Sequence, residues 1–144
     1  MKLEKEFNAY LADLAVMNFK LHNIHWNVEG MQFVAVHEFT EKLYDEMFDN
    51  MDEVAEHMKK YQILPDATLE SMLKNASIKE EPSRRFECAE GLKIVLADLE
   101  LLRKNATDLR NKADEENWFS AVGMLEDEID SYNKHIWFIR ATLG

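Results

Sequence analysis

The chain has 144 residues, 47% of them hydrophobic, with only four glycines and two prolines. This composition excludes a disordered chain and predicts a single domain over residues 1–144 with a substantial core. The formal net charge is −11, so the surface is expected to repel nucleic acid and anionic membranes and to attract cations.

The cysteine content and the N-terminal segment predict the compartment. Cys88 is the only cysteine, so no disulfide can form within the chain and a reducing compartment is expected. The segment MKLEKEFNAYLADL has no unbroken apolar stretch of the kind found in signal peptides. No window approaches the roughly 20 apolar residues of a membrane span. We therefore expect a cytoplasmic protein.

Four long segments place apolar side chains at steps of three and four residues, which is the period of an α-helix. They run from Phe7 to Val28, from Val36 to Met58, from Leu92 to Leu109 and from Trp118 to Leu143. Gly30 separates the first segment from the second. Strict alternation is missing throughout, so the sequence predicts an all-α fold.

A connection of about 20 residues joins the second and third helical segments and can run the length of a bundle. Pro65 and Pro82 bound it, and Thr68 is placed to cap a short helix from Leu69 to Asn75. One long crossover after the second helix is typical of the ferritin-like four-helix bundle, whereas cytokine-type bundles need two. The predicted fold is a ferritin-like bundle with a short extra helix in this crossover.

Three of the five histidines lie between His22 and Phe39, spaced among apolar side chains. They are either metal ligands or core histidines with satisfied hydrogen bonds, and for His22 and His135 we expect the structural role. On the second helix, one narrow arc carries an imidazole and four carboxylates. Imidazole with carboxylates suits iron, manganese or zinc, although a solvated acidic face is the alternative. The members of the arc are His37, Glu41, Asp45, Asp52 and Glu56.

The spacing along the second helix limits how these side chains can share a metal. His37 and Glu41 are one turn apart, and so are Asp52 and Glu56. His37 and Asp52 are separated by 15 residues, which is about 22 Å along the axis, too far for one ion. Either two half-sites exist, or a second chain in two-fold symmetry supplies the missing half. No histidine has a glutamate three residues before it, which disfavours an ordinary di-iron site within one chain.

Two motifs resemble the signatures of the Dps family of mini-ferritins. The first is HWNVEGMQFVAVHEFTE, with His25 followed by an aromatic residue, a glycine five residues on, a second histidine at twelve and an acid four residues further. The second is MDEVAEH, which ends in His57 where the family commonly has arginine. The ending KHIWFIRATLG is also family-like, and the helix pattern that resembles the family covers nearly the whole chain.

The resemblance implies a dodecameric shell that oxidises Fe(II) with hydrogen peroxide or oxygen and stores ferric mineral. Its sites lie between subunits, so His25 and His37 would come from one chain, with Asp52 and Glu56 from its two-fold mate. Glu41 would be a supporting or second-iron ligand, since two irons can share a site. Trp26 would line the site. Iron is here both substrate and cargo.

Residues 114–130 carry seven acids and no Lys or Arg. The resemblance implies that acids near the start of the fourth helix line iron pores. The alternative is that these acids stabilise a helix N-terminus through its dipole. The candidate pore residues are Asp114, Glu115, Glu116 and Asp127.

The sequence suggests three alternative functions. A ferroxidase and iron-storage shell is favoured by the candidate ligands. A nucleoid DNA-binding protein of Dps type is disfavoured, because Lys2 and Lys5 near the N-terminus are offset by Glu4 and Glu6. A structural or surface-recognised particle is the third. A ferroxidation assay and a gel shift at low salt separate them.

Overall fold

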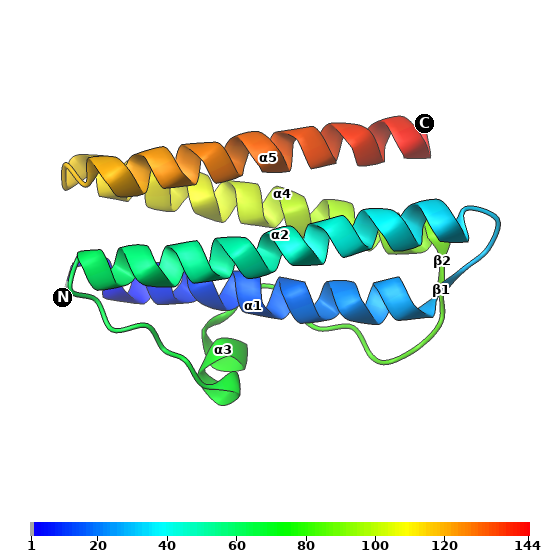
Figure 1. Ribbon diagram of the computed structural model, residues 1–144, viewed down its shortest axis with the longest axis horizontal. Coiled ribbons are helices and arrows are strands. Elements are labelled where there is room, and N and C mark those ends of the chain that lie inside the picture. Colours follow the sequence, from blue (N-terminus) through cyan, green and yellow to red (C-terminus); the bar gives the residue numbers. More distant parts are fainter. Residues whose placement is uncertain (1) are drawn as a thin grey trace.

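The computed structural model describes residues 2–144 as four long helices, one short helix and two two-residue strands (Figure 1). The all-α fold, with its extra helix in the crossover, is confirmed. In chain order the elements are α1 (Glu4–Asn27), β1 (Val28–Glu29), α2 (Phe33–Lys60), α3 (Leu69–Asn75), β2 (Phe86–Glu87), α4 (Cys88–Glu115) and α5 (Phe119–Leu143).

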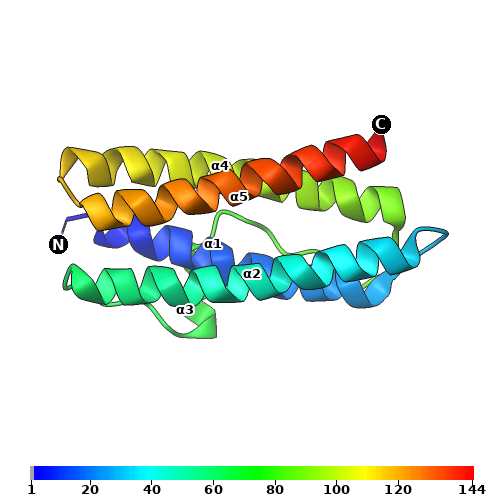
Figure 2. The ribbon, with the colours of Figure 1, turned by 45° about the horizontal axis from the view of Figure 1, so that its top comes forward.

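The long helices form two antiparallel hairpins that pack into one bundle. Helix α1 packs mainly against α2, and α4 mainly against α5. The crossover carries α3 along the outside of α1 and returns the chain to the end where α1 finishes, so α4 runs parallel to α2 (Figures 1 and 2). None of the helices in residues 2–144 has the length and apolar character needed to cross a membrane.

The helix boundaries follow local chemistry. Gly30 adopts a φ of 131°, a conformation open to glycine, between α1 and α2. Thr68 caps α3 as predicted: its hydroxyl accepts from the Ser71 backbone N–H while the Ser71 hydroxyl accepts from Thr68 N–H. Two boundaries differ from the sequence prediction, because Val28 leaves α1 for strand β1 and Trp118 is the N-cap of α5.

The parallel pairing of β1 with β2 was not anticipated. Val28 is opposite Phe86 and Glu29 is opposite Glu87. Two-residue strands have no alternation to detect, so the periodicity could not reveal them. The pair ties the end of α1 to the start of α4.

A buried carboxylate on α1 holds the middle of the crossover. Asp13, 1% exposed, accepts from the backbone N–H groups of Ser77 and Ile78 at 2.7 and 3.0 Å. The Ser77 hydroxyl and the Asn105 amide of α4 also donate to it, at 2.9 and 3.0 Å. A charged acceptor with several donors is a strong arrangement, so Asp13 joins α1, the crossover and α4.

Replacement of Asp13 by Ala should loosen the crossover because it leaves buried donors without an acceptor. We expect a loss of about 2–4 kcal/mol in stability, with amide protection lost first at Ser77 and Ile78. Hydrogen exchange followed by mass spectrometry measures this directly. Asp108→Ala is the control, since Asp108 is exposed and, among residues 2–144, forms an ion pair with Lys104 alone. Equal protection of the crossover in both variants would contradict the assigned role.

Candidate metal centre

Two histidines face each other where α1 ends and α2 begins. The rings of His25 and His37 are stacked with centroids 3.6 Å apart and planes 15° apart. His25 Nδ1 donates to the His37 carbonyl oxygen at 2.7 Å, and His37 Nδ1 donates to the His25 carbonyl oxygen at 2.9 Å. The short turn around Gly30 brings these positions, twelve residues apart, into register.

The reciprocal bonds determine the tautomer of both rings. A carbonyl oxygen only accepts, so each Nδ1 carries a proton, and in the neutral form of either ring Nε2 keeps a free lone pair. His25 is 4% exposed, and burial lowers the pKa of its imidazole against the opposing effect of the bond to the His37 carbonyl. Neutral imidazoles held through Nδ1 are the form in which histidine binds metals.

Aromatic side chains and one threonine surround the pair. Phe33 stacks on His37 with centroids 4.9 Å apart, and Tyr44 meets the His25 ring edge-on at 5.1 Å. The Thr40 hydroxyl is fully buried and lies 3.2 Å from His25 Nδ1. Sequence reasoning missed Phe33 and Thr40, since neither a threonine nor a phenylalanine near a histidine carries a metal-site signal.

His22, for which we expect a structural role, packs among aromatic side chains. Its Nδ1 donates to the Asn18 carbonyl at 2.8 Å, and its ring stacks on Tyr44 at 3.7 Å. Trp26 contacts this ring at 5.3 Å and remains 63% exposed. A chain of ring contacts through Tyr44, His22 and Trp26 thus extends from the histidine pair to the surface.

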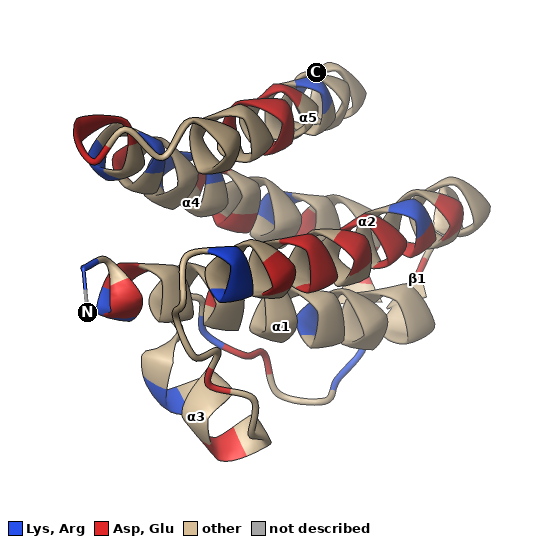
Figure 3. Ribbon diagram, turned by 60° about the vertical axis from the view of Figure 1, so that its left-hand side comes forward, with Lys and Arg blue, Asp and Glu red and all other residues tan. Residues whose placement is uncertain are grey.

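Apart from the half-buried Glu46, the carboxylates of α2 are exposed and follow one another along the helix (Figure 3). Glu41 is near the histidines, where it accepts a long hydrogen bond of 3.5 Å from the Tyr44 hydroxyl. Asp52 and Glu56 lie far along α2 in a groove that we call the acidic groove. Its lining residues are Asp49, Asp52, Glu53, Glu56, His57 and Lys60.

The structure brings His25 and His37 together but leaves Asp52 and Glu56 apart from them. Among residues 2–144, no three His, Cys, Asp or Glu side chains converge on one position suited to a metal ion. One chain therefore presents two separate halves, a histidine pair with Glu41 and an acidic groove. A pairing of chains is required if both halves serve one ion.

Three candidate pore acids, Asp114, Glu115 and Glu116, lie at the turn between α4 and α5, and Asp127 lies further on, within α5. Asp114 and Glu115 are in the last turn of α4, and the first turn of α5 has no acid. The alternative that these acids stabilise a helix N-terminus is therefore wrong, because a helix C-terminus disfavours negative charge. Glu116 accepts from Lys2 at 3.0 Å, and Arg110 lies 3.8 Å from Asp114.

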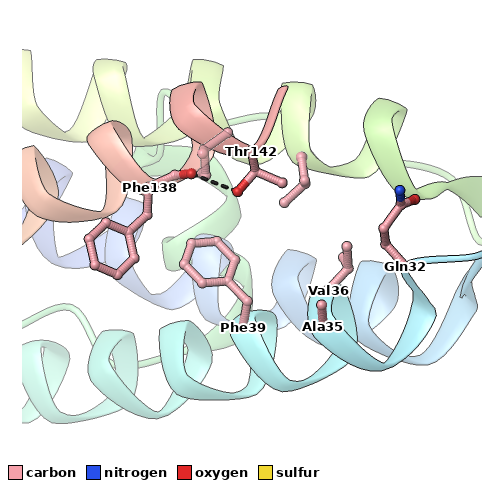
Figure 4. Close-up of a pocket in the computed structure, with 8 residues that line it drawn as sticks. Gln32, Ala35, Val36, Phe39, Phe138 and Thr142 are labelled. Atoms are coloured by element: carbon pink, nitrogen blue, oxygen red, sulfur yellow. Dashed lines mark hydrogen bonds between the residues drawn. The ribbon is translucent and has the colours of Figure 1, made fainter. Parts of the chain in front are cut away.

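A separate apolar cavity of about 140 Å³ opens between α2, α4 and α5 at the end of the bundle that holds the histidines. The rings of Phe39 and Phe138 approach each other across it (Figure 4). The Thr142 hydroxyl donates a hydrogen bond to the Phe138 carbonyl oxygen at 2.7 Å. Its lining has no carboxylate, imidazole or thiol, so it holds no metal ligand. The lining residues are Gln32, Ala35, Val36, Phe39, Leu92, Phe138, Ile139 and Thr142.

Comparison with known proteins agrees with this fold. Residues 4–144 match the ferritin-like domain, so the chain is a ferritin-like protein. It is 37% identical over 142 residues to the DNA protection during starvation protein of Listeria innocua, covering 97% of this chain and 91% of that one. Identity to the Helicobacter pylori protein of the same name is 34% over 133 residues, which is 92% of each chain.

Solved structures of related proteins have the same fold as this chain. Dps from Listeria monocytogenes matches with a TM-score of 0.95 at 33% identity, over 100% of this chain and 94% of that one. The Helicobacter cinaedi protein CAIP matches with a TM-score of 0.95 at 35% identity, over 99% of this chain and 100% of that one. The chain belongs to the Dps family.

Gly30→Ala should destabilise the turn that sets the histidine pair. A side chain at a φ of 131° is strained, and its Cβ would lie 3.3 Å from Cys88 Sγ. We expect a loss of about 1–3 kcal/mol, measured by chemical denaturation. Gly123→Ala is the matched control, because nothing lies within 4 Å of the added Cβ in the second turn of α5. That variant should gain about 0.5–1 kcal/mol. A Gly30→Ala chain as stable as the parent would contradict the assigned strain.

Proposed function

We propose that the protein is a ferroxidase and iron-storage protein that oxidises Fe(II) at sites shared between two chains. The observation that carries the proposal is the histidine pair, whose two Nε2 atoms are free while the carboxylates able to complete a site lie about 22 Å away on the same helix. Membership of the Dps family supports it.

The ligand chemistry suits iron as substrate. Neutral imidazole with carboxylate is a ligand set that iron accepts, and added carboxylates favour Fe(III) because they offset its extra charge. His25 and His37 of one chain, with Asp52 and Glu56 of its mate, would form each site, and Glu41 would hold a second iron. Hydrogen peroxide accepts two electrons, so two Fe(II) ions reduce it to water without releasing a hydroxyl radical. Trp26 would form the site wall.

Two-fold pairing is the geometry that this mechanism needs. Antiparallel α2 helices would place residue 37 of each chain opposite residues 52 and 56 of the other, twice per dimer. A dodecamer built from six such dimers would enclose the mineral. Acids at the α4–α5 turn, with Asp127 within α5, would admit iron. Of the four candidate pore residues, Glu115 and Asp127 have no ion pair among residues 2–144 and are the ones free to attract Fe(II).

Mixed assembly tests the shared site. One variant carries His25→Ala with His37→Ala, and the other carries Asp52→Ala with Glu56→Ala. Each homo-oligomer should lose Fe(II) oxidation, because every site lacks one half. Random co-assembly makes about half of all dimers mixed, and each mixed dimer regains one intact site of two. We expect about a quarter of the parental oxidation rate, followed by absorbance with peroxide and with oxygen.

Two controls make the result decisive. Mass spectrometry under native conditions shows whether the two variants share an oligomer, and circular dichroism shows whether both remain helical. If each site were built within one chain, mixing would restore nothing. Confirmed co-assembly without recovered oxidation would therefore reject the shared site, and parental rates in both homo-oligomers would reject the assigned ligands.

DNA binding is the second candidate function, and the names of the relatives direct attention to it. The charge of −11 per chain opposes contact with phosphates. We expect no stable complex with duplex DNA at about 0.15 M salt in a gel-shift assay. The assay needs a chelator, because divalent ions can bridge carboxylates to phosphates. A clear shift with metal removed would show that binding to DNA is intrinsic to the protein.

A further inference from the structure

A glutamate inside the bundle is buried without a cation beside it. Glu128 on α5 is 3% exposed. One of its oxygens, Oε1, accepts from the Tyr10 hydroxyl of α1 at 2.6 Å, and the other, Oε2, is buried with no hydrogen-bond partner among residues 2–144. No Lys, Arg or His side chain in this part of the chain forms an ion pair with it. A negative charge on Glu128 would therefore lack compensation.

Two buried tyrosines fix the direction of the hydrogen bonds at Glu128. The hydroxyls of Tyr10 and Tyr132 lie 2.6 Å apart, and both side chains are at most 2% exposed. Tyr10 has one hydroxyl proton and gives it to Glu128, so Tyr132 is the donor in the bond between the tyrosines. These bonds join α5 to α1, which belong to different hairpins. A neutral carboxyl group completes them, since Oε1 only has to accept while Oε2 carries the proton.

The groups that face Glu128 from α1 and α2 are neutral or negative. Helix α1 contributes the Tyr10 hydroxyl, and α2 contributes the charges of Glu53 and Glu46. Burial is the main cause that raises the pKa of Glu128 from 4.5 to about 8. The charges of Glu53 and Glu46 act in the same direction, and the Tyr10 hydrogen bond opposes them. The neutral acid is therefore the form that suits these surroundings.

Helix α4 also packs on α5 but offers Glu128 no cation. The charged side chains of α4 that reach α5 are engaged at exposed positions. These contacts are Arg103 with Asn133, Arg110 with Glu126, and Glu100 with Arg140. On α5 itself, His135 bonds to Glu46 at 3.0 Å. Within residues 2–144, a proton is thus the positive charge that remains for Glu128.

We propose that Glu128 is a proton-controlled link between the two helical hairpins. While it holds its proton, it completes the bonds from α5 to α1 without placing a charge in the interior. When it loses that proton, the charge has no cation and is repelled by Glu46 and Glu53 of α2, so water has to enter between the hairpins to solvate it. The link uses none of the candidate iron ligands, and it does not depend on the proposed ferroxidase function.

Glu128→Gln tests the link, because the amide has the shape of the neutral acid and cannot ionise. In the assembled protein at about pH 6, infrared difference spectra of the parent against this variant should show a carboxylic-acid C=O band, lost as the pH rises past about 8. Glu126→Gln is the matched control, because Glu126 is exposed and pairs with Arg110. That variant should keep the band and lose it at the same pH as the parent.

Thermal unfolding gives the sign of the effect. The pKa of Glu128 is raised in the folded chain, so the stability due to its proton is complete below about pH 4.5 and is lost as the pH rises to about 8. The melting temperature of the parent should therefore fall relative to that of Glu128→Gln over this range and level off above it. At about pH 9.5, amide hydrogen exchange in α5 should be faster in the parent than in Glu128→Gln, and equal in both at about pH 6.

Tyr10→Phe keeps the test valid if Glu128→Gln fails to assemble. It removes the hydroxyl and retains the ring. Because the Tyr10 hydrogen bond lowers the pKa of Glu128, its loss should shift the disappearance of the acid band to higher pH. A parent protein without the acid band at about pH 6 would overturn the proposal, as would equal exchange in the parent and Glu128→Gln at about pH 9.5. An acid band that persists unchanged in Glu128→Gln would assign the proton to another residue and reject the link.

Discussion

The reciprocal hydrogen bonds between His25 and His37 determine how the end of α1 meets the start of α2. Each ring bonds to the backbone carbonyl of the other residue, so a slip of either helix by one residue breaks both bonds. The same bonds use the Nδ1 atoms and leave the Nε2 atoms available. Because the pair lies at one end of α2, the carboxylates further along that helix are beyond its reach. The rise along α2 separates the candidate ligands into two halves, and this contact fixes the histidine half at the start of the helix.

Much of the fold could be predicted from the sequence because helical periodicity and capping are local. The four long helices follow from apolar spacing, and α3 follows from Thr68, whose side-chain cap needs only residues three apart. The conclusion that one chain cannot complete the candidate site also follows from local geometry, since the rise per residue fixes the distance from His37 to Asp52. No three possible ligands converge among residues 2–144, which agrees with it.

Contacts between distant residues could not be predicted in this way. The ring nitrogens of the histidine pair bond to backbone carbonyls, and every residue has one, so no sequence pattern marks the partner. Lys20 and Asp98 form a buried ion pair at 2.7 Å across 78 positions of sequence, and nothing in their composition distinguishes them from surface charges. Glu128 likewise reads as one acid in an acidic stretch, yet it is buried while its neighbour Asp127 is exposed. The environment of each carboxyl group, and not its residue type, makes the buried Glu128 differ from the exposed Asp127.

The contacts of Asp13 bear on the order in which the chain folds. Its partners Ser77 and Asn105 are 64 and 92 residues away, so bringing them together closes long loops at a cost in chain entropy. The α1–α2 hairpin needs only the short turn around Gly30 and can form early. The crossover can lock only after α4 has arrived beside α1. During synthesis, residues 61–87 would therefore stay open until most of the chain has left the ribosome, and this segment is where a chaperone or a protease would meet the immature protein.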